Sequence, residues 1–412
     1  MIPLIQSLHL EGKRVLLRAD LNVPVQDKVI IQDHRLRALL PTIDYILAHG
    51  GKAILIGHIG RPQPQIFDEN FSTLIIAQWL RDHGYHADHE LDLMNAIARS
   101  HQLRDLILVF ENLRFFQGER EVNDHFADLL AQLGDVYIND AFGTMHRPDT
   151  SVTLLAEKFS PENRACGKLV EKEIAELSHL QTSAEQPFVM VLGGSKIDDK
   201  IGTIEQFITK EAEHRVTSIL VGGLLAQAFL QAQNPSLRNV EIDDYAVSKA
   251  RQIIDLAQQF SVEIVLPTDF FATQFDLGSS PLQFAADAIP QGSRCVDIGP
   301  ATAHDFSMKI AEAKTIFMNG TMGIYEYPEY ASGTTTVLNA IASSGAHTVI
   351  GGGDAVAATF QSGFAENISF LSTGGGATLA FLAADNPYRK LPALKALCSN
   401  GENVLDALER HV

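Results

Sequence analysis

Cysteine is scarce in this sequence, and the cysteines present are poorly placed for cross-linking. The three are Cys166, Cys295 and Cys398, which lie far apart and form no Cys-x-x-Cys pair. An odd number at such spacing predicts neither a disulfide framework nor a zinc site, and it favours a reducing compartment. The first residues have no basic segment followed by a long apolar one, so we expect no secretory signal.

Basic residues are outnumbered, and no charge-free apolar run is long enough to span a bilayer. The 412-residue chain has 32 lysines and arginines against 50 aspartates and glutamates, a formal net charge of −18. This acidity argues against a general binder of nucleic acids or of anionic membranes, although local arginine clusters can still bind small anions. We expect a cytoplasmic protein with enough chain for two or more domains.

Both common glycine-rich nucleotide motifs are absent, yet two other glycine-rich segments, Gly193–Lys200 and Gly351–Asp354, follow apolar, strand-like runs. Glycine lets main-chain amides approach a phosphate, lysine supplies a compact positive charge, and aspartate can bind a metal ion. Lys196 and Lys200 are four residues apart at the expected start of a helix, so one helix face should present both to a phosphate. The second half of the chain is therefore predicted to bind a nucleotide.

Short apolar runs alternate with longer helical patterns along the chain. In the first half the expected strands are Arg14–Arg18, Ala53–Gly57, Leu106–Phe110 and Val136–Ile138. In the second half they are Phe188–Leu192, Ser218–Val221, Glu263–Leu266, Thr315–Met318, Thr348–Ile350 and Ile368–Leu371. The helical patterns include Leu36–His49, Gly167–Leu180 and Ile201–His214. This alternation predicts an α/β protein with parallel sheets covered by helices, and with ligands beyond the carboxyl ends of the strands.

We expect two doubly wound, Rossmann-like domains that face each other across a hinge cleft. The N-terminal domain is predicted to span residues 1–166, an interdomain helix 167–181, and the C-terminal domain 182–390. A tail of residues 391–412 has an amphipathic pattern through Val404, Leu405 and Leu408, which predicts that it packs back on the N-terminal domain.

Polar side chains in the first half follow the predicted strands. They include the arginines Arg35, Arg61, Arg114 and Arg147, which come from four different connections, together with Asp20, Asn22 and His58. The forked guanidinium group donates paired hydrogen bonds to phosphate and carboxylate. Taken singly, each arginine can be a surface ion pair, His58 a satisfied polar residue, and Asp20 with Asn22 an Asx-turn. Their shared position beside strand ends favours a single anion site.

Further glycine turns and polar side chains in the second half have two interpretations each. Gly222-Gly223 and Gly374–Gly376 either approach a ligand closely or only shape a loop. Glu326 either accepts hydrogen bonds from ribose hydroxyls or is a solvated loop acid. An anion site in one half and a nucleotide site in the other together suggest group transfer.

The ordered set of motifs resembles the phosphoglycerate kinase family over nearly the whole chain. The matching segments are Arg18–Pro24, His58–Pro62, Glu111–Phe115, Asn139–Thr144, Gly193–Lys196, Asn319–Gly320, Gly351–Asp354 and Ser372–Ala377. The resemblance implies reversible transfer of a phosphoryl group between 1,3-bisphosphoglycerate and ADP, giving 3-phosphoglycerate and ATP. It also implies Mg²⁺ as cofactor, small-molecule substrates as the partners, and a monomer.

The resemblance also implies a role for each site residue. Binding of 3-phosphoglycerate or its acyl phosphate is implied for Asp20, Asn22, Arg35, His58, Arg61, Arg114 and Arg147. Nucleotide binding is implied for Gly194, Ser195, Lys196, Lys200, Gly222, Gly223, Asn319, Ile324, Glu326, Gly351, Gly352, Gly353, Asp354 and Ala355. Within these sets, Arg35 and Lys196 would stabilise the phosphoryl group in transfer, and Asp354 would hold Mg²⁺.

Some positions depart from the family pattern and keep other hypotheses open. Ala355 stands where a threonine usually faces nucleotide phosphate, and Ala380 replaces an expected glutamate. Smaller departures are Gly57, Thr321 and the pair Phe317-Met318. One alternative is a non-catalytic relative that binds a ligand or a partner protein. Another is a kinase acting on a different small carboxylic acid, against which the complete arginine set argues.

Overall fold

The computed structural model describes residues 2–102, 107–237, 242–274 and 277–398 and divides the chain into two compact units. The first unit runs through Ile174 and takes in the chain again from Asn386, and the second spans Ala175–Asp385. The boundary falls within helix α6 (Lys168–Thr182). Within those described ranges, no helix is both long enough and apolar enough to cross a bilayer.

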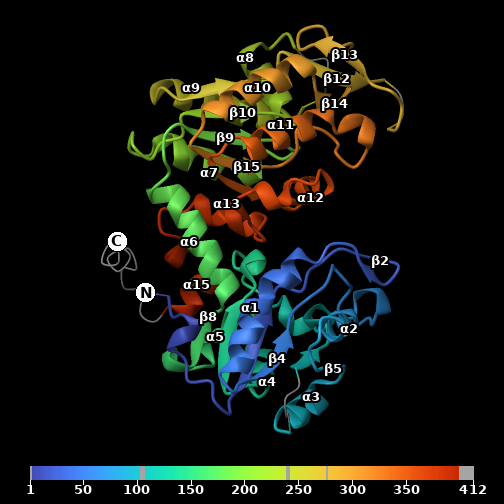
Figure 1. Ribbon diagram of the computed structural model, residues 1–412, viewed down its shortest axis with the longest axis vertical. Coiled ribbons are helices and arrows are strands. Elements are labelled where there is room, and N and C mark those ends of the chain that lie inside the picture. Colours follow the sequence, from blue (N-terminus) through green and yellow to red (C-terminus); the bar gives the residue numbers. More distant parts are fainter. Residues whose placement is uncertain (1, 103–106, 238–241, 275–276, 399–412) are drawn as a thin grey trace. The chain divides into compact units, whose positions relative to one another are not determined.

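A six-stranded parallel sheet forms the centre of the first unit (Figure 1). Its order is β5-β6-β4-β1-β7-β8. The bounds are β1 Arg14–Ala19, β4 Lys52–Ile56, β5 Ala87–Glu90, β6 Ile107–Phe110, β7 Val136–Asp140 and β8 Arg164–Cys166. The helices of this unit are α1 His34–Ala48, α2 Leu74–Asp82, α3 Leu93–Ser100, α4 Asp124–Ala131, α5 Leu154–Glu157, α14 Pro387–Lys390 and α15 Pro392–Leu397.

The sheet is buried on both faces, as its uninterrupted apolar strands predict. Successive residues Val15, Leu16 and Leu17 of β1 are all 0% exposed although their side chains alternate between faces. Helix α1 packs an apolar stripe that includes Leu39 and Ile43 into the same core as Val15 and Leu17.

The second unit repeats this architecture with the strand order β11-β10-β9-β15-β16-β17, again parallel. When the strands are numbered in chain order, this is 3-2-1-4-5-6, the Rossmann arrangement. The order in which strands are added to the sheet reverses between β9 and β15. The bounds are β9 Phe188–Leu192, β10 Ser218–Val221, β11 Glu263–Val265, β15 Thr315–Asn319, β16 His347–Gly351 and β17 Phe370–Leu371. The helices are α7 Asp198–Thr209, α8 Leu225–Gln233, α9 Asp244–Gln259, α10 Pro300–Glu312, α11 Ser332–Ser343, α12 Gly353–Gln361 and α13 Gly376–Leu382. The prediction of two parallel-sheet α/β domains is confirmed.

Two small antiparallel sheets were not expected from the sequence. One has the order β13-β12-β14, formed by Leu282–Ala285, Asp269–Thr273 and Arg294–Ile298. The other is the hairpin of β2 (Val25–Gln26) and β3 (Val29–Ile30).

Several predicted boundaries need correction. The helix expected over Ile201–His214 is α7, which begins earlier and ends at Thr209, because the chain turns extended at Lys210. Leu106, assigned to a strand, and Val404, Leu405 and Leu408 of the predicted tail lie outside the described residues. The described part of that tail includes α15, which contacts α5 and β8.

Candidate active site

Neighbouring strands of the first unit bring together the connections that carry the predicted anion-binding residues. Parallel strands β6, β4, β1 and β7 lie side by side, so their carboxyl ends share one edge of the sheet. The residues at that edge are Asp20 and Asn22 after β1, His58 and Arg61 after β4, Arg114 after β6, Arg147 after β7, and Arg35 in the first turn of α1. The fold therefore gathers all seven from separate parts of the sequence.

Hydrogen bonds tie these connections to one another. Asn22 Oδ1 accepts from the main-chain nitrogen of Gly60 at 2.8 Å, which links the loops after β1 and β4. Arg114 Nη1 donates to the main-chain oxygen of Gly60 at 2.5 Å, which adds the segment after β6. Arg35 pairs with Asp20 at 3.3 Å. Contacts within the protein thus restrain the side chains of Asn22, Arg114 and Arg35.

Several partly buried arginines lie close enough together at this edge to lower one another's pKa. Burial, followed by the charge of Arg147, lowers the pKa of Arg114 from 12.5 to about 10. The pKa of Arg147 is also lowered, by burial and by several arginines that include Arg61. Burial and the charges of neighbouring arginines lower the pKa of His58 well below 6.5. A bound anion would relieve this repulsion, which is the expected electrostatics of a phosphate or carboxylate site.

In the second unit, the loops after β9 and β15 cross so closely that side chains have no room. A Cβ on Gly193 would lie 2.1 Å from the oxygen of Thr321, and one on Gly320 would lie 2.5 Å from the oxygen of Gly193. Gly320 also has a φ of +85°, a conformation that glycine adopts without strain. This crossing lies where the strand order reverses, the usual position for a ligand in such a sheet.

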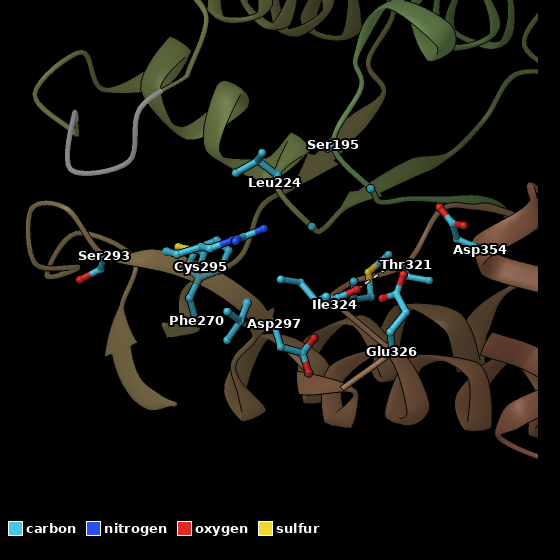
Figure 2. Close-up of a pocket in the computed structure, with 16 residues that line it drawn as sticks. Ser195, Leu224, Phe270, Ser293, Cys295, Asp297, Thr321, Ile324, Glu326 and Asp354 are labelled. Carbon is cyan, nitrogen blue, oxygen red and sulfur yellow. Dashed lines mark hydrogen bonds between the residues drawn. The ribbon is translucent and has the colours of Figure 1, made fainter. Parts of the chain in front are cut away.

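A pocket of about 440 Å³ opens beside this crossing (Figure 2). The predicted nucleotide-binding residues that line it are Gly194, Ser195, Gly223, Ile324, Glu326 and Asp354. In Figure 2 Leu224 and Phe270 lie toward one side of the pocket with Ser293, Cys295 and Asp297, and Glu326 and Asp354 lie toward the other, with Ile324 between them. A lining that combines the apolar surface of Leu224, Phe270 and Ile324 with carboxylates suits a ligand that has a flat base and a polar tail.

The remaining predicted nucleotide-binding residues lie around the pocket rather than in its lining. They are Lys196, Lys200, Gly222, Asn319, Gly351, Gly352, Gly353 and Ala355. Asn319 Nδ2 donates to the main-chain oxygen of Gly351 at 3.0 Å, so it ties the loops after β15 and β16 together. Ala355 lies in the first turn of α12 and is 0% exposed.

The expectation that Lys196 and Lys200 share a helix face is wrong. Helix α7 begins at Asp198, so Lys196 lies in the turn before it and is exposed, whereas Lys200 is only 6% exposed. Asp198 and Asp199 occupy the first turn, where a helix favours negative charge. Burial lowers the pKa of Lys200, and the Lys200 ammonium donates to the main-chain oxygen of Lys196 at 3.3 Å.

Asp354 supplies the carboxylate that a nucleotide-bound magnesium ion would need. It lines the pocket and is close enough to Lys200 to influence that residue's pKa. Mg²⁺ is commonly bound by one or two carboxylates plus substrate phosphates and waters. No cluster of three or more His, Cys, Asp or Glu side chains suited to a metal occurs in the described ranges. The donor set therefore fits an ion that arrives with phosphate, and does not fit a cage made by protein alone.

Comparison with known proteins identifies the family. Residues 5–385 match the family model described as phosphoglycerate kinase. This chain belongs to the phosphoglycerate kinase family. It is 40% identical over 399 residues to the phosphoglycerate kinase of Herpetosiphon aurantiacus, and this alignment covers 95% of this chain and 98% of that relative. It is 39% identical over 388 residues to that of Chlamydia pneumoniae, covering 92% and 95% respectively.

Solved phosphoglycerate kinase structures have the same fold. The enzyme from Pyrococcus horikoshii superposes with a TM-score of 0.80 at 29% identity, covering 96% of this chain and 98% of that one. The enzyme from Coxiella burnetii gives a TM-score of 0.78 at 30% identity with the same coverage. Since 96% of this chain is covered, the likeness extends over both units.

The sequence did not predict the residues that line one side of the pocket. This side is lined by Leu224, by Ser293 just before β14, and by residues of the β12–β14 sheet, namely Phe270, Arg294, Cys295, Val296 and Asp297. Asp297 is buried, and its carboxylate accepts from the main-chain nitrogens of Gly333 at 2.6 Å and Ile298 at 2.9 Å. Burial raises its pKa to about 7. The available signal was the apolar pair Cys295-Val296, which is too short to predict a strand because Arg294 and Asp297 flank it.

Proposed function

We propose that this chain is a phosphoglycerate kinase that transfers a phosphoryl group reversibly between 1,3-bisphosphoglycerate and ADP, giving 3-phosphoglycerate and ATP. Family membership supports the reaction. The observation that carries the acceptor assignment is the set of polar residues gathered at one edge of the first unit's sheet, where Arg114 and Arg147 have lowered pKa values. That edge suits a small molecule with a phosphate and a carboxylate.

The acceptor in the direction of ATP consumption is a carboxylate, which is already ionised at neutral pH. The protein therefore has to position the reactants and stabilise charge, and it needs no general base. We assign substrate binding to Asp20, Asn22, Arg35, His58, Arg61, Arg114 and Arg147. Arg35 and Lys196 would stabilise the charge on the phosphoryl oxygens during transfer.

The nucleotide would bind in the pocket of the second unit. Leu224, Phe270 and Ile324 offer apolar surface to a base, and Glu326 offers a carboxylate to ribose hydroxyls. Lys200 would bind nucleotide phosphate, and Asp354 would hold Mg²⁺, which supplies charge neutralisation of the phosphates when bound. We further propose a monomeric, cytoplasmic enzyme of glycolysis and gluconeogenesis.

We assign acceptor binding to residues 1–166 and nucleotide binding to residues 182–390. Residues 167–181 would form the connecting helix, and residues 391–412 a tail that packs on the N-terminal domain. In-line transfer requires reacting atoms within about 3–3.5 Å. That the domains close a hinge cleft around both ligands stays a prediction.

A coupled assay of the purified chain with 3-phosphoglycerate and Mg-ATP tests the proposal. We expect ADP formation that depends on both substrates, and loss of most of it in Arg35→Ala. Calorimetry in parallel separates binding from turnover. Binding of both ligands by a well-folded chain that shows no turnover would refute the proposed activity and favour a non-catalytic relative.

A further inference from the structure

A buried arginine lies directly behind His58, in a position to which neither the sequence motifs nor the proposed mechanism assigns a role. Arg18 is in β1, is 0% exposed, and its Nη2 lies 3.2 Å from His58 Nδ1. Its Nη1 donates to the main-chain oxygen of Ala19 at 2.7 Å, and its Nε donates to Ser151 Oγ at 2.8 Å. The guanidinium group is thus held at several points, with one nitrogen directed at the imidazole.

The chemistry of the two groups decides which of them donates. A guanidinium group has only donors, so His58 Nδ1 has to be the acceptor. An imidazole that accepts at Nδ1 is neutral and carries its proton on Nε2. A protonated imidazolium would instead direct a second donor and a second positive charge at Arg18, which makes that state unfavourable here. The remaining nitrogen, Nε2, is therefore a hydrogen-bond donor.

Ser151 and Glu119 support the arginine from the other side. Ser151 is 0% exposed and Glu119 is 1% exposed. The hydroxyl of Ser151 accepts from Arg18, so its single proton goes to Glu119 Oε1, which is 2.6 Å away. Glu119 Oε2 accepts from the main-chain nitrogen of Ser151 at 3.0 Å. Tyr137 donates its hydroxyl proton to the main-chain oxygen of Ser151 at 2.8 Å, which further restrains this segment.

We propose that Arg18, Ser151 and Glu119 are positioning residues, whose buried chain of hydrogen bonds holds His58 as a neutral imidazole with its proton on Nε2. The chain runs in one direction, because Arg18 donates to both His58 and Ser151, and Ser151 donates to Glu119. His58 then contributes a directed hydrogen bond to an oxygen of an anionic ligand, and the net charge of the site comes from the arginines. The identity of that ligand as 3-phosphoglycerate rests on the proposed function, whereas the tautomer of His58 does not.

The first test measures the tautomer in the full-length chain at pH 7. Long-range ¹H–¹⁵N correlation spectra of ¹⁵N-histidine-labelled protein distinguish the tautomers, and His58→Gln assigns the signals of His58. We expect a neutral ring with Nδ1 unprotonated and Nε2 protonated. A ring protonated on Nδ1, or on both nitrogens, would overturn the proposal, and this measurement on the parent does not require Ser151→Ala to fold.

The second test removes the supporting hydroxyl in Ser151→Ala. We expect the His58 signals to move toward a mixture of tautomers, and the KM for 3-phosphoglycerate to rise roughly two- to tenfold, the effect of one weakened hydrogen bond, with kcat nearly unchanged. The matched control is Ser100→Ala, because Ser100 is also 0% exposed and accepts from an arginine, Arg14, at 3.0 Å. The control should lose stability without changing either readout.

The outcomes separate this inference from the proposed function. If His58 signals in Ser151→Ala are identical to those of the parent, the positioning role is refuted. If the parent shows the expected tautomer and Ser151→Ala disturbs it, but the parent has no kinase activity, the positioning role is supported and the proposed function is refuted.

Discussion

Arg35 Nη1 lies 3.3 Å from Asp20 Oδ1 and 3.3 Å from the main-chain oxygen of Asn22. The loop after β1 therefore holds one end of this guanidinium group, while the Arg35 side chain keeps 18% of its surface exposed. An arginine restrained in this way loses little further conformational freedom when it binds an anion. This anchoring suits a residue that stabilises charge during phosphoryl transfer.

Replacing Arg35 with alanine should lower turnover by roughly 10²-fold or more, the usual loss for a preorganised charge-stabilising donor. The KM for 3-phosphoglycerate should change less, because Arg61, Arg114 and Arg147 remain. Arg37→Ala is the matched control, since Arg37 is on the same helix and pairs with Asp33 at the surface. Steady-state kinetics of both variants check this, and turnover of Arg35→Ala within a few-fold of the parent would remove Arg35 from the mechanism.

Replacing Lys200 with methionine keeps the length of this buried side chain and removes its charge. A hydrogen bond to a charged group contributes about 1.5–3 kcal/mol, so the KM for ATP should rise roughly tenfold to hundredfold. Lys210→Met is the control, because Lys210 is also partly buried with a lowered pKa but donates to the main-chain oxygen of Gln181. Equal KM values for ATP in Lys200→Met and the parent would show that Lys200 does not bind nucleotide phosphate.

Position 355 tests whether the missing hydroxyl weakens nucleotide binding. Ala355→Thr should raise the affinity for ATP roughly two- to tenfold if the hydroxyl donates a hydrogen bond to a phosphate. Ala355→Val is the matched control, because valine has the shape of threonine without the hydroxyl and reports any packing cost at this fully buried position. Calorimetry on both variants checks the prediction. Equal ATP affinities would mean that the hydroxyl has no partner there.

Asp140 should make the protein less stable as the pH rises. Burial raises its pKa from 3.8 to about 7, so the stability associated with its protonated form is present below pH 3.8 and is lost as the pH rises through 7. Asp140→Asn should abolish this decline, so its Tm relative to the parent should be higher at pH 8 than at pH 5. Thermal unfolding across that range measures the difference.

Asp135→Asn provides a control of opposite sign for the same experiment. Hydrogen bonds from Arg14, which lies 2.7 Å away, hold the pKa of Asp135 below 3.8 despite partial burial. Its stabilising effect is present above that value and is lost as the pH falls through the lowered pKa. Its Tm relative to the parent should therefore be lower at both pH 5 and pH 8. A parallel change in the two variants would contradict the assignment of the raised pKa to Asp140.

The central strands were predictable because burial on both faces requires long apolar runs. The predicted bounds of Phe188–Leu192 and Ser218–Val221 coincide with β9 and β10. The β12–β14 sheet was not predicted, because its strand Leu282–Ala285 is largely exposed and carries no strong apolar signal. The polar residues at the strand ends were found because turn sequences are local, and the sheet order then determines which of them meet.

The burial of particular charged side chains could not be predicted from the sequence pattern. Arg18 and Glu119 are fully or almost fully buried, yet in the sequence they resemble ordinary surface residues. Their burial depends on hydrogen bonds to Ser151, more than a hundred positions after Arg18 and 32 after Glu119. Likewise, Gly194 has a φ of +80° and α7 begins only at Asp198, so the place of Lys196 outside the helix was missed.

The crossing of Gly193 and Gly320 restricts how this enzyme can be redesigned. Main chain packs against main chain there, and even one added methyl group would collide with it. Directed evolution of nucleotide preference would therefore find few folded variants with substitutions at Gly193 or Gly320. The side chains of Leu224, Phe270 and Cys295 line the pocket without such backbone crossing, so a library randomised at these positions can alter the fit of the base and leave the loops intact.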